Sequence, residues 1–310
     1  MAASRSWPLL LGLLLAFLSG CDDGPPALRV DLSRRANLTT PQAAPAVTYA
    51  YLPQYSHSVS YARHHPLIQY LARQTGLNFR QIFPDTFADH IRLMAEGHMD
   101  ISFSNPMAYI EMAGHGARAF ARILEPGGQP SFHGVIICRK DDARIRTLAD
   151  CRGKRWIAVD PVSAGGFLYP LGLFLENGVR RRDFAEISFA PGPGGKQEKV
   201  VLAVLAGRSD IGSIRDGTLE LMAGKADLAQ IRILGRSRAY PGWMYAAGRN
   251  LPQEQVDRIA MALFALDLAI PEHSLILEKA GMGGVIPATD RDFDPVRDLV
   301  AAVEADRTGE

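Results

Sequence analysis

The chain has almost no excess of charge of either sign. Its 310 residues include 34 lysines and arginines and 33 aspartates and glutamates, for a formal net charge of +1. A nearly neutral protein has no long-range field that would gather nucleic acid, so a general polyanion binder is excluded. Three cysteines are too few for a disulfide scaffold. We therefore expect any bound anion to be held by local geometry rather than by overall charge.

Catalytic and metal-binding signatures are also missing from the sequence. It contains no G-x-S-x-G elbow, no H-E-x-x-H pair and no Walker motif. Segment 192–196 is glycine-rich and ends in lysine, but no Ser or Thr follows that lysine. His64 and His65 are adjacent, so they do not share one helix face as metal ligands would. We expect no enzyme, no cofactor and no metal site.

Long hydrophobic runs are scarce, and the one at the N-terminus is short. Leu9 to Leu18 is an apolar stretch of about ten residues, too short to span a bilayer as a helix. Leu18-Ser-Gly-Cys21 follows and resembles the bacterial lipobox. We predict a signal peptide over 1–20 and a lipid on Cys21, which places the protein in the periplasm, and Asp22 favours retention at the inner membrane. The alternative is an ordinary signal peptide with an incidental cysteine.

Beyond this segment, the pattern separates a tether from a folded part. Residues 21–45 are proline-rich and without an apolar period, which predicts a flexible tether. After Ala46, strands and helices alternate, which is typical of α/β units with a mainly parallel sheet. The predicted strands are 47–51, 77–83, 99–103, 133–139, 156–160, 187–189, 210–214, 231–235 and 243–247. The predicted helices are 66–76, 87–97, 106–114, 147–153, 167–177, 196–207, 218–222, 253–268 and 294–305.

The segment after the predicted strand at 156–160 carries the strongest indication of a ligand. Ser163 supplies a hydroxyl, and Gly165 and Gly166 lack Cβ atoms, so backbone N–H groups can approach a ligand closely. The helix that follows adds unpaired N–H donors and a partial positive charge at its first turn. These features together predict an oxyanion site. The alternative is an ordinary strand-to-helix turn with a serine N-cap.

The same segment carries a family resemblance. Asp160-Pro-Val-Ser-Ala-Gly-Gly-Phe-Leu-Tyr-Pro170 resembles the D-P-x-S-x-S-G-Y-x-x-P segment of the phosphate/phosphite/phosphonate-binding (PhnD-like) family of ABC-transporter solute receptors. Four further segments resemble family motifs in the same order, namely 97–109, 133–141, 148–154 and 201–212. The likeness covers about residues 46–270.

The resemblance implies a two-lobed type II periplasmic binding protein fold of the α/β class, with a mainly parallel sheet in each lobe. Lobe 1 would comprise 46–135, lobe 2 would comprise 136–240, and 241–310 would return to lobe 1. The ligand would lie in the cleft, and the lobes would close by a hinge motion. The implied function is lipid-anchored capture of a small oxyanion (phosphate, phosphite or phosphonate) for an ABC permease.

Two other functions stay open at this point. The first is a sensory protein of the same fold that signals to a membrane histidine kinase. The second is a lipoprotein of this fold that binds no oxyanion and serves envelope assembly or redox maturation.

The resemblance also implies which residues line the ligand site. Ser163, Gly165 and Gly166 match the family's anion loop, whereas its second hydroxyl is replaced at Ala164 or Gly165. Tyr51 and Tyr109 match cleft aromatics, and a core tyrosine is the alternative for Tyr109.

Four further candidates lie where this chain departs from the family pattern or crosses between the lobes. Lys196 begins the Lys-Gln-Glu that replaces a common S-H-D and could supply a charge to an anion, with a solvated lysine as the alternative. Arg215 could grip an oxyanion with two hydrogen bonds, with an ion pair to Asp216 as the alternative. This Arg215-Asp216 pair stands where relatives that bind aminoalkyl groups offer acidic side chains, which favours small inorganic oxyanions. His133 lies at the lobe crossing and could face the cleft.

Cys138 and Cys151 fall at apolar positions of a predicted strand and a predicted helix. Buried free thiols, a disulfide in the oxidising periplasm, or a thiol site for a soft metalloid are all compatible with that pattern.

Overall fold

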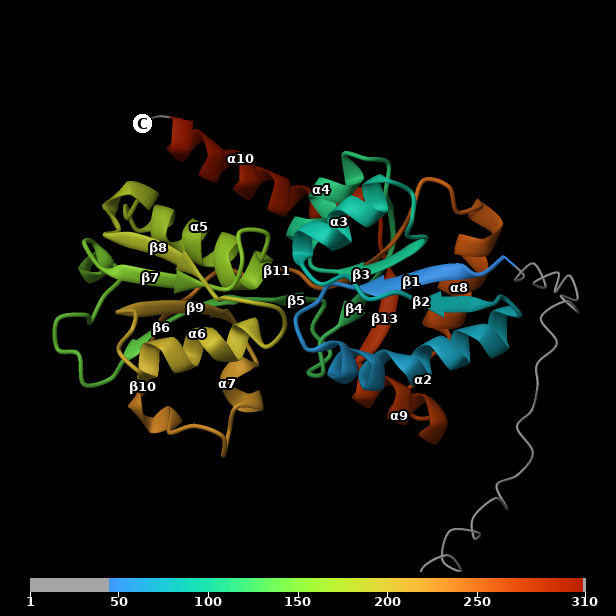
Figure 1. Cartoon of the computed structure of the whole chain (residues 1–310), viewed down its shortest axis with the longest axis horizontal. Coiled ribbons are helices and arrows are strands. Elements are labelled where there is room, and N and C mark those ends of the chain that lie inside the picture. Colours follow the sequence, from blue (N-terminus) through green and yellow to red (C-terminus); the bar gives the residue numbers. More distant parts are fainter. Residues whose placement is uncertain (1–44, 309–310) are drawn as a thin grey trace, which may run out of the picture. The chain divides into compact units, whose positions relative to one another are not determined.

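Residues 45–308 are described by a computed structural model, in which two β-sheets are flanked by helices and joined by a short crossover (Figure 1). Three predictions lie outside the described residues: the signal peptide, the lipidation site at Cys21 and the tether up to residue 44. Among the described residues, no helix is both long and apolar enough to cross a membrane.

The first sheet has six strands in the order β13-β4-β12-β3-β1-β2. Parallel pairing joins β2, β1 and β3, whereas β12, β4 and β13 pair antiparallel. Every residue of β1 is buried, as its apolar sequence VTYAY predicts. The strands are β1 (Val47–Tyr51), β2 (Phe79–Gln81), β3 (Ile101–Ser104), β4 (Arg118–Leu124), β12 (Met244–Ala247) and β13 (Gly284–Pro287).

The second sheet has five strands in the order β10-β6-β9-β7-β8. Here β7 pairs parallel with β8 and β9, and β6 pairs antiparallel with β9 and β10. The strands are β6 (Gly134–Arg139), β7 (Arg155–Ala158), β8 (Glu186–Phe189), β9 (Ile211–Arg215) and β10 (Ile231–Arg236). Both sheets are therefore mixed, which corrects the expectation of a mainly parallel sheet. The two strands that follow a passage between the sheets, β6 and β12, each pair antiparallel with both of their neighbours.

A two-stranded ribbon connects the two sheets. The chain leaves the first sheet after β4, passes through β5 (Ser131–Phe132) and enters β6. It returns from β10 through β11 (Tyr240–Pro241) into β12, and β5 pairs antiparallel with β11. Both passages thus lie side by side in the middle of Figure 1. The predicted lobe boundaries near 135 and 240 stay predictions.

The helices cover the faces of these sheets. On the first sheet lie α2 (His57–Thr75), α3 (Phe87–Ala95), α4 (Pro106–Ala113), α8 (Gln253–Phe264) and α9 (Pro271–Ala280). On the second lie α5 (Tyr169–Glu176), α6 (Lys196–Leu205) and the short α7 (Thr218–Leu221). The C-terminal α10 (Asp294–Thr308) contacts both α4 and α5. A Cβ on Gly172 of α5 would lie 2.6 Å from Cδ1 of Leu299 of α10, so this glycine permits the close contact.

Several predicted elements differ in extent from the structure. Helix α2 begins at His57, with Ser56 as N-cap, and Pro66 lies inside it. The predicted helix 147–153 is only a 3₁₀ turn at Ala149–Cys151, and the predicted helix 167–177 begins earlier, as a π-turn at Ala164–Leu168. Strands β4, β5, β11 and β13 and helix α9 were not predicted.

Candidate functional site

The loop between β7 and α5 has the geometry of an anion-binding turn. Ser163 is the N-cap of the π-turn (φ −84°, ψ 116°), and its Oγ accepts a hydrogen bond from the N–H of Gly166 at 3.1 Å. The proton of this hydroxyl is not used in any hydrogen bond among the described residues, so it is available to a ligand. The predicted strand-to-helix turn is therefore present with Ser163 as its N-cap, and the role of Ser163 as a donor to a ligand stays a prediction.

Two backbone donors of this turn have no partner. Among the described residues, no hydrogen bond uses the N–H of Ala164 or of Gly165. Both residues line a small cavity of about 10 Å³ together with Ser163. A cavity of this size has room for roughly one water molecule. Buried N–H groups without an acceptor are rare, and at the start of a helix they favour an anion.

The two glycines of the loop are required by close packing. A Cβ on Gly165 would lie 2.5 Å from Cε2 of Phe132 and 2.9 Å from Cβ of Arg215. A Cβ on Gly166 would lie 2.3 Å from Cγ2 of Val159. Any side chain at either position would therefore displace the wall of the cavity.

Arg215, at the end of β9, faces the anion loop from the neighbouring strand and lines the same cavity. Its backbone N–H donates to Oε1 of the buried Gln197 at 3.0 Å. Its guanidinium lies 4.7 Å from the centroid of the Phe132 ring and donates to Oε2 of Glu125 at 2.7 Å. Because Glu125 follows β4, this ion pair connects the two sheets. The predicted alternative, an ion pair with Asp216, is not formed among the described residues, because the guanidinium of Arg215 pairs with Glu125 instead.

Further hydrogen bonds join the two sides of the cleft. Asn105 Nδ2 donates to the carbonyl of Val162 at 3.2 Å, and the N–H of Gly195 donates to the carbonyl of Gln54 at 2.8 Å. Asn105, Gln54 and Trp243 also line the small cavity. These contacts connect the two sides of the cleft next to the anion loop.

Lys196 does not offer an unpaired charge to a ligand. Its Nζ donates to Oδ2 of Asp160 at 2.5 Å, and both side chains are only 13% exposed. The ammonium also lies 5.4 Å from the ring centroid of Phe87, on the other side of the cleft. Asp160 in turn fixes the loop, because its carboxylate accepts a hydrogen bond from the N–H of Val162. Lys196 therefore orients the anion loop through Asp160, which corrects the expectation of a direct contact.

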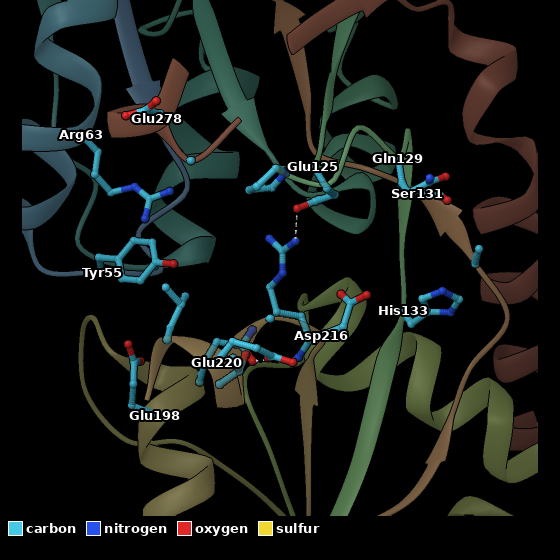
Figure 2. A pocket seen from close by; sticks show the side chains of 18 residues that line it. Tyr55, Arg63, Glu125, Gln129, Ser131, His133, Glu198, Asp216, Glu220 and Glu278 are labelled. Carbon is cyan, nitrogen blue, oxygen red and sulfur yellow. Dashed lines mark hydrogen bonds and ion pairs between the residues drawn. The ribbon is translucent and has the colours of Figure 1, made fainter. Parts of the chain in front are cut away.

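A larger pocket of about 850 Å³ lies beside the small cavity (Figure 2). Arg215 and Gln197 line both. His133 and Asp216 lie in its wall, and their contact with a ligand stays a prediction. The ring Nδ1 of His133 is 2.7 Å from the carbonyl oxygen of Ser237. Most charged side chains around the pocket are acidic, namely Glu125, Glu198, Asp216, Glu220 and Glu278.

The two predicted cleft tyrosines lie in different places. Tyr51 ends β1 and lines a third pocket, of about 40 Å³, which Arg215 also lines. The ring of Tyr51 is stacked on the ring of His64, with 4.8 Å between their centroids. Burial raises the pKa of the Tyr51 phenol to about 12. Tyr109 is fully buried, packs on Phe293 and donates to Asp290, so the structure does not bring it to the anion loop. For Tyr109 the core alternative corrects the expectation of a ligand contact.

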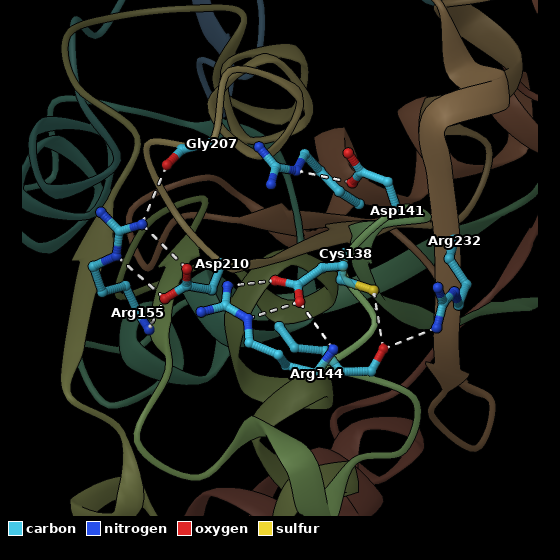
Figure 3. Close-up of polar contacts among 10 residues, drawn as sticks. Cys138, Asp141, Arg144, Arg155, Gly207, Asp210 and Arg232 are labelled. Carbon is cyan, nitrogen blue, oxygen red and sulfur yellow. Dashed lines mark hydrogen bonds and ion pairs between the residues drawn. The ribbon is translucent and has the colours of Figure 1, made fainter.

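The two cysteines are free and buried, and no disulfide joins them. Sγ of Cys138 is 3.9 Å from the carbonyl oxygen of Ile145, to which Arg232 also donates (Figure 3). Sγ of Cys151 is 3.8 Å from the carbonyl oxygen of Thr147, and burial raises the pKa of this thiol to about 12. No cluster of three metal-binding side chains occurs in the described part of the chain.

Several lining residues were not candidates at the sequence level, in particular Glu125, Gln54, Asn105 and Trp243. Asn105 stands out in sequence only as a helix cap before Pro106, and that role is real, since its Oδ1 accepts from Ala108 at 3.0 Å. Nothing local marks Glu125, because its contact to Arg215 spans 90 positions of the chain.

Comparison with known proteins assigns the family. Residues 49–293 match the family model described as "ABC transporter, phosphonate, periplasmic substrate-binding protein". The chain is 31% identical over 286 residues to the phosphate-import protein PhnD of Mycolicibacterium smegmatis, covering 86% of this chain and 88% of the relative.

Solved structures of low sequence identity share the fold. A binding-protein component of a phosphonate ABC transporter from Pseudomonas aeruginosa matches with a TM-score of 0.74 at 20% identity, covering 86% of this chain and 88% of the other. PhnD1 of Prochlorococcus marinus, in complex with methylphosphonate, matches with a TM-score of 0.73 at 14% identity, covering 84% and 98%. The two-lobed α/β architecture is thereby confirmed. The chain belongs to the family of periplasmic substrate-binding proteins of phosphonate and phosphate ABC transporters.

Proposed function

We propose that this protein captures a small tetrahedral phosphorus oxyanion, namely phosphate, phosphite or a phosphonate, and delivers it to an ABC permease. The observation that carries the proposal is the pair of N–H groups of Ala164 and Gly165 that have no partner among the described residues and lie at a small cavity. Both donors belong to the turn that begins a helix, where an anion is stabilised by the peptide dipoles.

Two side chains add to these donors. The hydroxyl of Ser163 has its proton available, and the guanidinium of Arg215 lies on the adjacent strand end. A guanidinium has five N–H donors in a planar fork that matches an oxyanion.

The relatives support the ligand class. The Mycolicibacterium smegmatis protein is named for phosphate import, and the Prochlorococcus marinus structure contains methylphosphonate. Phosphate has four oxygens on a tetrahedral phosphorus and methylphosphonate has three, so both offer several acceptors to the N–H donors of Ala164 and Gly165. The sensory alternative would use the same site, and deletion of the permease gene distinguishes the two: transport predicts lost uptake of the ligand, whereas sensing predicts unchanged uptake and a lost transcriptional response.

Calorimetry on the full-length chain tests the ligand. Phosphate, phosphite, methylphosphonate, aminoethylphosphonate, sulfate and arsenite are titrated after endogenous ligand has been removed by partial unfolding. We expect one phosphorus oxyanion to bind with a micromolar or lower Kd, and Ser163→Ala to weaken it about tenfold or more, since a charge-assisted hydrogen bond is lost. A folded protein that binds none of the phosphorus oxyanions would contradict the proposal.

We also propose that a lipid on Cys21 anchors the protein to the periplasmic face of the inner membrane. The lipobox-like segment Leu18–Cys21 supports this, together with the periplasmic location of the family. Cys21→Ser is expected to move the protein from the membrane fraction to the soluble periplasmic fraction. Wild-type protein that is soluble without detergent would contradict the anchor and leave the capture function intact.

A further inference from the structure

A buried serine connects the core of the second sheet to the anion loop. Ser213 of β9 is completely buried, and its Oγ lies 2.9 Å from Nε1 of Trp156 on the neighbouring strand β7. The same Oγ lies 2.6 Å from the carbonyl oxygen of Gly166 in the loop. Trp156 is also completely buried, and neither side chain lines the small cavity or the two other pockets described above. An effect of either side chain on a ligand must therefore pass through the loop.

The chemistry of these groups fixes the direction of both hydrogen bonds. The indole N–H of Trp156 can only donate, so Oγ of Ser213 accepts from it. A serine hydroxyl has a single proton, and a carbonyl oxygen can only accept, so Ser213 directs this proton to the carbonyl of Gly166. The two bonds thus run in one direction, from the indole to the loop.

The carbonyl of Gly166 needs this donor because Pro170 follows four residues later. In an α-helix this carbonyl would accept from the N–H of residue 170, but proline has no N–H. Two other donors reach it instead, the hydroxyl of Ser213 and the backbone N–H of Val159 at 3.2 Å. Without the hydroxyl of Ser213, only the longer of these two bonds would hold the Gly166 peptide.

From Gly166 the chain of hydrogen bonds continues to a donor at the cavity. The peptide group that contains the Gly166 carbonyl also contains the N–H of Phe167, which donates to the carbonyl of Ser163 at 3.1 Å. The peptide group that contains the Ser163 carbonyl also contains the N–H of Ala164. This N–H has no partner among the described residues and lies at the small cavity. Hydrogen bonds that follow one another in this way polarise and strengthen each other.

Aromatic packing fixes the start of this chain. The ring of Trp156 packs against the rings of Phe167, Phe174 and Phe184, with centroid distances of 5.4, 5.2 and 5.0 Å. Phe167 follows Gly166 in the loop, so the ring that begins the chain also packs on the segment that carries the anion donors. The indole N–H therefore has little freedom to turn to another acceptor.

We propose that Ser213 is a positioning residue of the anion site. It passes the hydrogen bond of Trp156 on to the Gly166 peptide, and it thereby orients and polarises the N–H of Ala164 toward the bound anion. This inference rests on the proposed function and goes beyond it, because it assigns a role in binding to two residues that do not contact the ligand. A serine that served stability alone would not couple the indole of Trp156 to the ligand.

Calorimetry on the full-length chain tests the role of Ser213. Ser213→Ala removes the donor to Gly166, so the affinity for the phosphorus oxyanion should fall about fivefold or more. Ser213→Thr keeps a hydroxyl at this position and should restore most of the affinity.

The matched control is Ser102→Ala. Ser102 of β3 is completely buried, and its Oγ lies 2.7 Å from Nε2 of the buried His90, but it lines none of the three pockets. Its replacement removes a buried hydroxyl next to a ring nitrogen, as Ser213→Ala does. We expect Ser102→Ala to lower the free energy of unfolding and to keep the wild-type affinity.

The indole N–H signal of Trp156 in heteronuclear NMR gives a second readout. The chain has three tryptophans, so Trp7→Phe and Trp243→Phe assign this signal by elimination in the ligand-free protein. Saturation with the phosphorus oxyanion should move the signal in the wild type, because a ligand at Ala164 strengthens every bond of the chain. In Ser213→Ala the same saturation should leave the signal where it is.

Several outcomes would overturn the inference. Wild-type affinity in Ser213→Ala removes Ser213 from binding, and an equal loss of affinity in Ser102→Ala shows a general effect of stability. A Trp156 signal that still moves in Ser213→Ala contradicts the chain. If Ser213→Ala does not fold, the wild type decides, since a Trp156 signal that saturation does not move also contradicts it. A wild type that binds no phosphorus oxyanion refutes the proposed function before any variant is made, and the inference falls with it.

Discussion

The phenol of Tyr109 donates a hydrogen bond of 2.5 Å to Oδ1 of Asp290 and accepts one of 3.2 Å from the N–H of Ala119. Arg297 of α10 donates to the same carboxylate oxygen, so Tyr109 connects α4 to the C-terminal helix. Tyr109→Phe leaves the N–H of Ala119 without this acceptor and removes one of the two hydrogen bonds to Oδ1 of Asp290. We expect the free energy of unfolding to fall by about 1–3 kcal/mol while oxyanion affinity is unchanged. Chemical denaturation and calorimetry measure the two effects, and a loss of affinity as large as that of Ser163→Ala would return Tyr109 to the ligand site.

A larger side chain at Gly165 tests whether the shape of the small cavity matters for binding. Gly165→Ala adds a methyl group within 2.5 Å of the Phe132 ring, and β5, which carries Phe132, is part of the connection between the sheets. We expect affinity for the phosphorus oxyanion to fall by about tenfold or more, because the added methyl group displaces the wall of the cavity and this displacement costs free energy.

The matched control is Gly127→Ala. Gly127 is exposed, has no positive φ and has nothing within 4 Å of an added Cβ, so affinity and thermal stability should both be unchanged. Equal behaviour of the two variants would show that close packing at Gly165 does not matter for binding.

The anion loop was predictable because all its features are local. A strand end, a serine and two glycines before a helix occur within one segment, and the structure places Ser163 at the N-cap as that pattern indicates. The role of Arg215 was predictable only in outline. Its partner Glu125 was not, because a glutamate before Pro126 and two glycines has the sequence of an ordinary turn and acquires its contact only when the two sheets meet.

The missed elements have physical reasons of the same kind. Strand β4 lies inside the first sheet, yet its sequence RAFARIL is only partly buried and carries two arginines, so no alternation marks it. Helix α2 was predicted to begin at Pro66, because proline normally belongs to a first helical turn. In the structure the polar residues from His57 onward are helical as well, since Ser56 caps them and His64 and Ser60 are buried on the helix face toward the core.

Two buried histidines predict a dependence of stability on pH. Burial lowers the pKa of His64 and of His90 to about 3 each. Below the unfolded value of about 6.5 the unfolded chain binds protons that the native chain does not, so stability is lost as pH falls from about 6.5 toward 3. The slope is about 1.4 kcal/mol per pH unit for each histidine.

Urea denaturation at pH 7 and at pH 5 measures this loss. His64→Gln should remove about half of the difference between the two free energies of unfolding. Equal stability at both pH values in the wild type would show that these histidines take up protons in the native state.

The thiols of Cys138 and Cys151 are expected to be unreactive in the native protein. Both are buried, and burial raises the pKa of each thiol, so little thiolate is present to react. In a Cys21→Ser variant, a thiol reagent at pH 8 should label neither cysteine before denaturation and both afterwards. Only one labelled thiol, or none, after denaturation without reductant would indicate a disulfide or another modification.

The position of β12 has a consequence for the order in which the two sheets can form during export. This strand lies between β3 and β4 in the first sheet, although it follows all strands of the second sheet in the chain. A chain that emerges on the periplasmic side with its N-terminus first therefore presents every strand of the five-stranded sheet before the six-stranded sheet receives β12. The five-stranded sheet can thus be complete while the six-stranded sheet still has an open gap between β3 and β4.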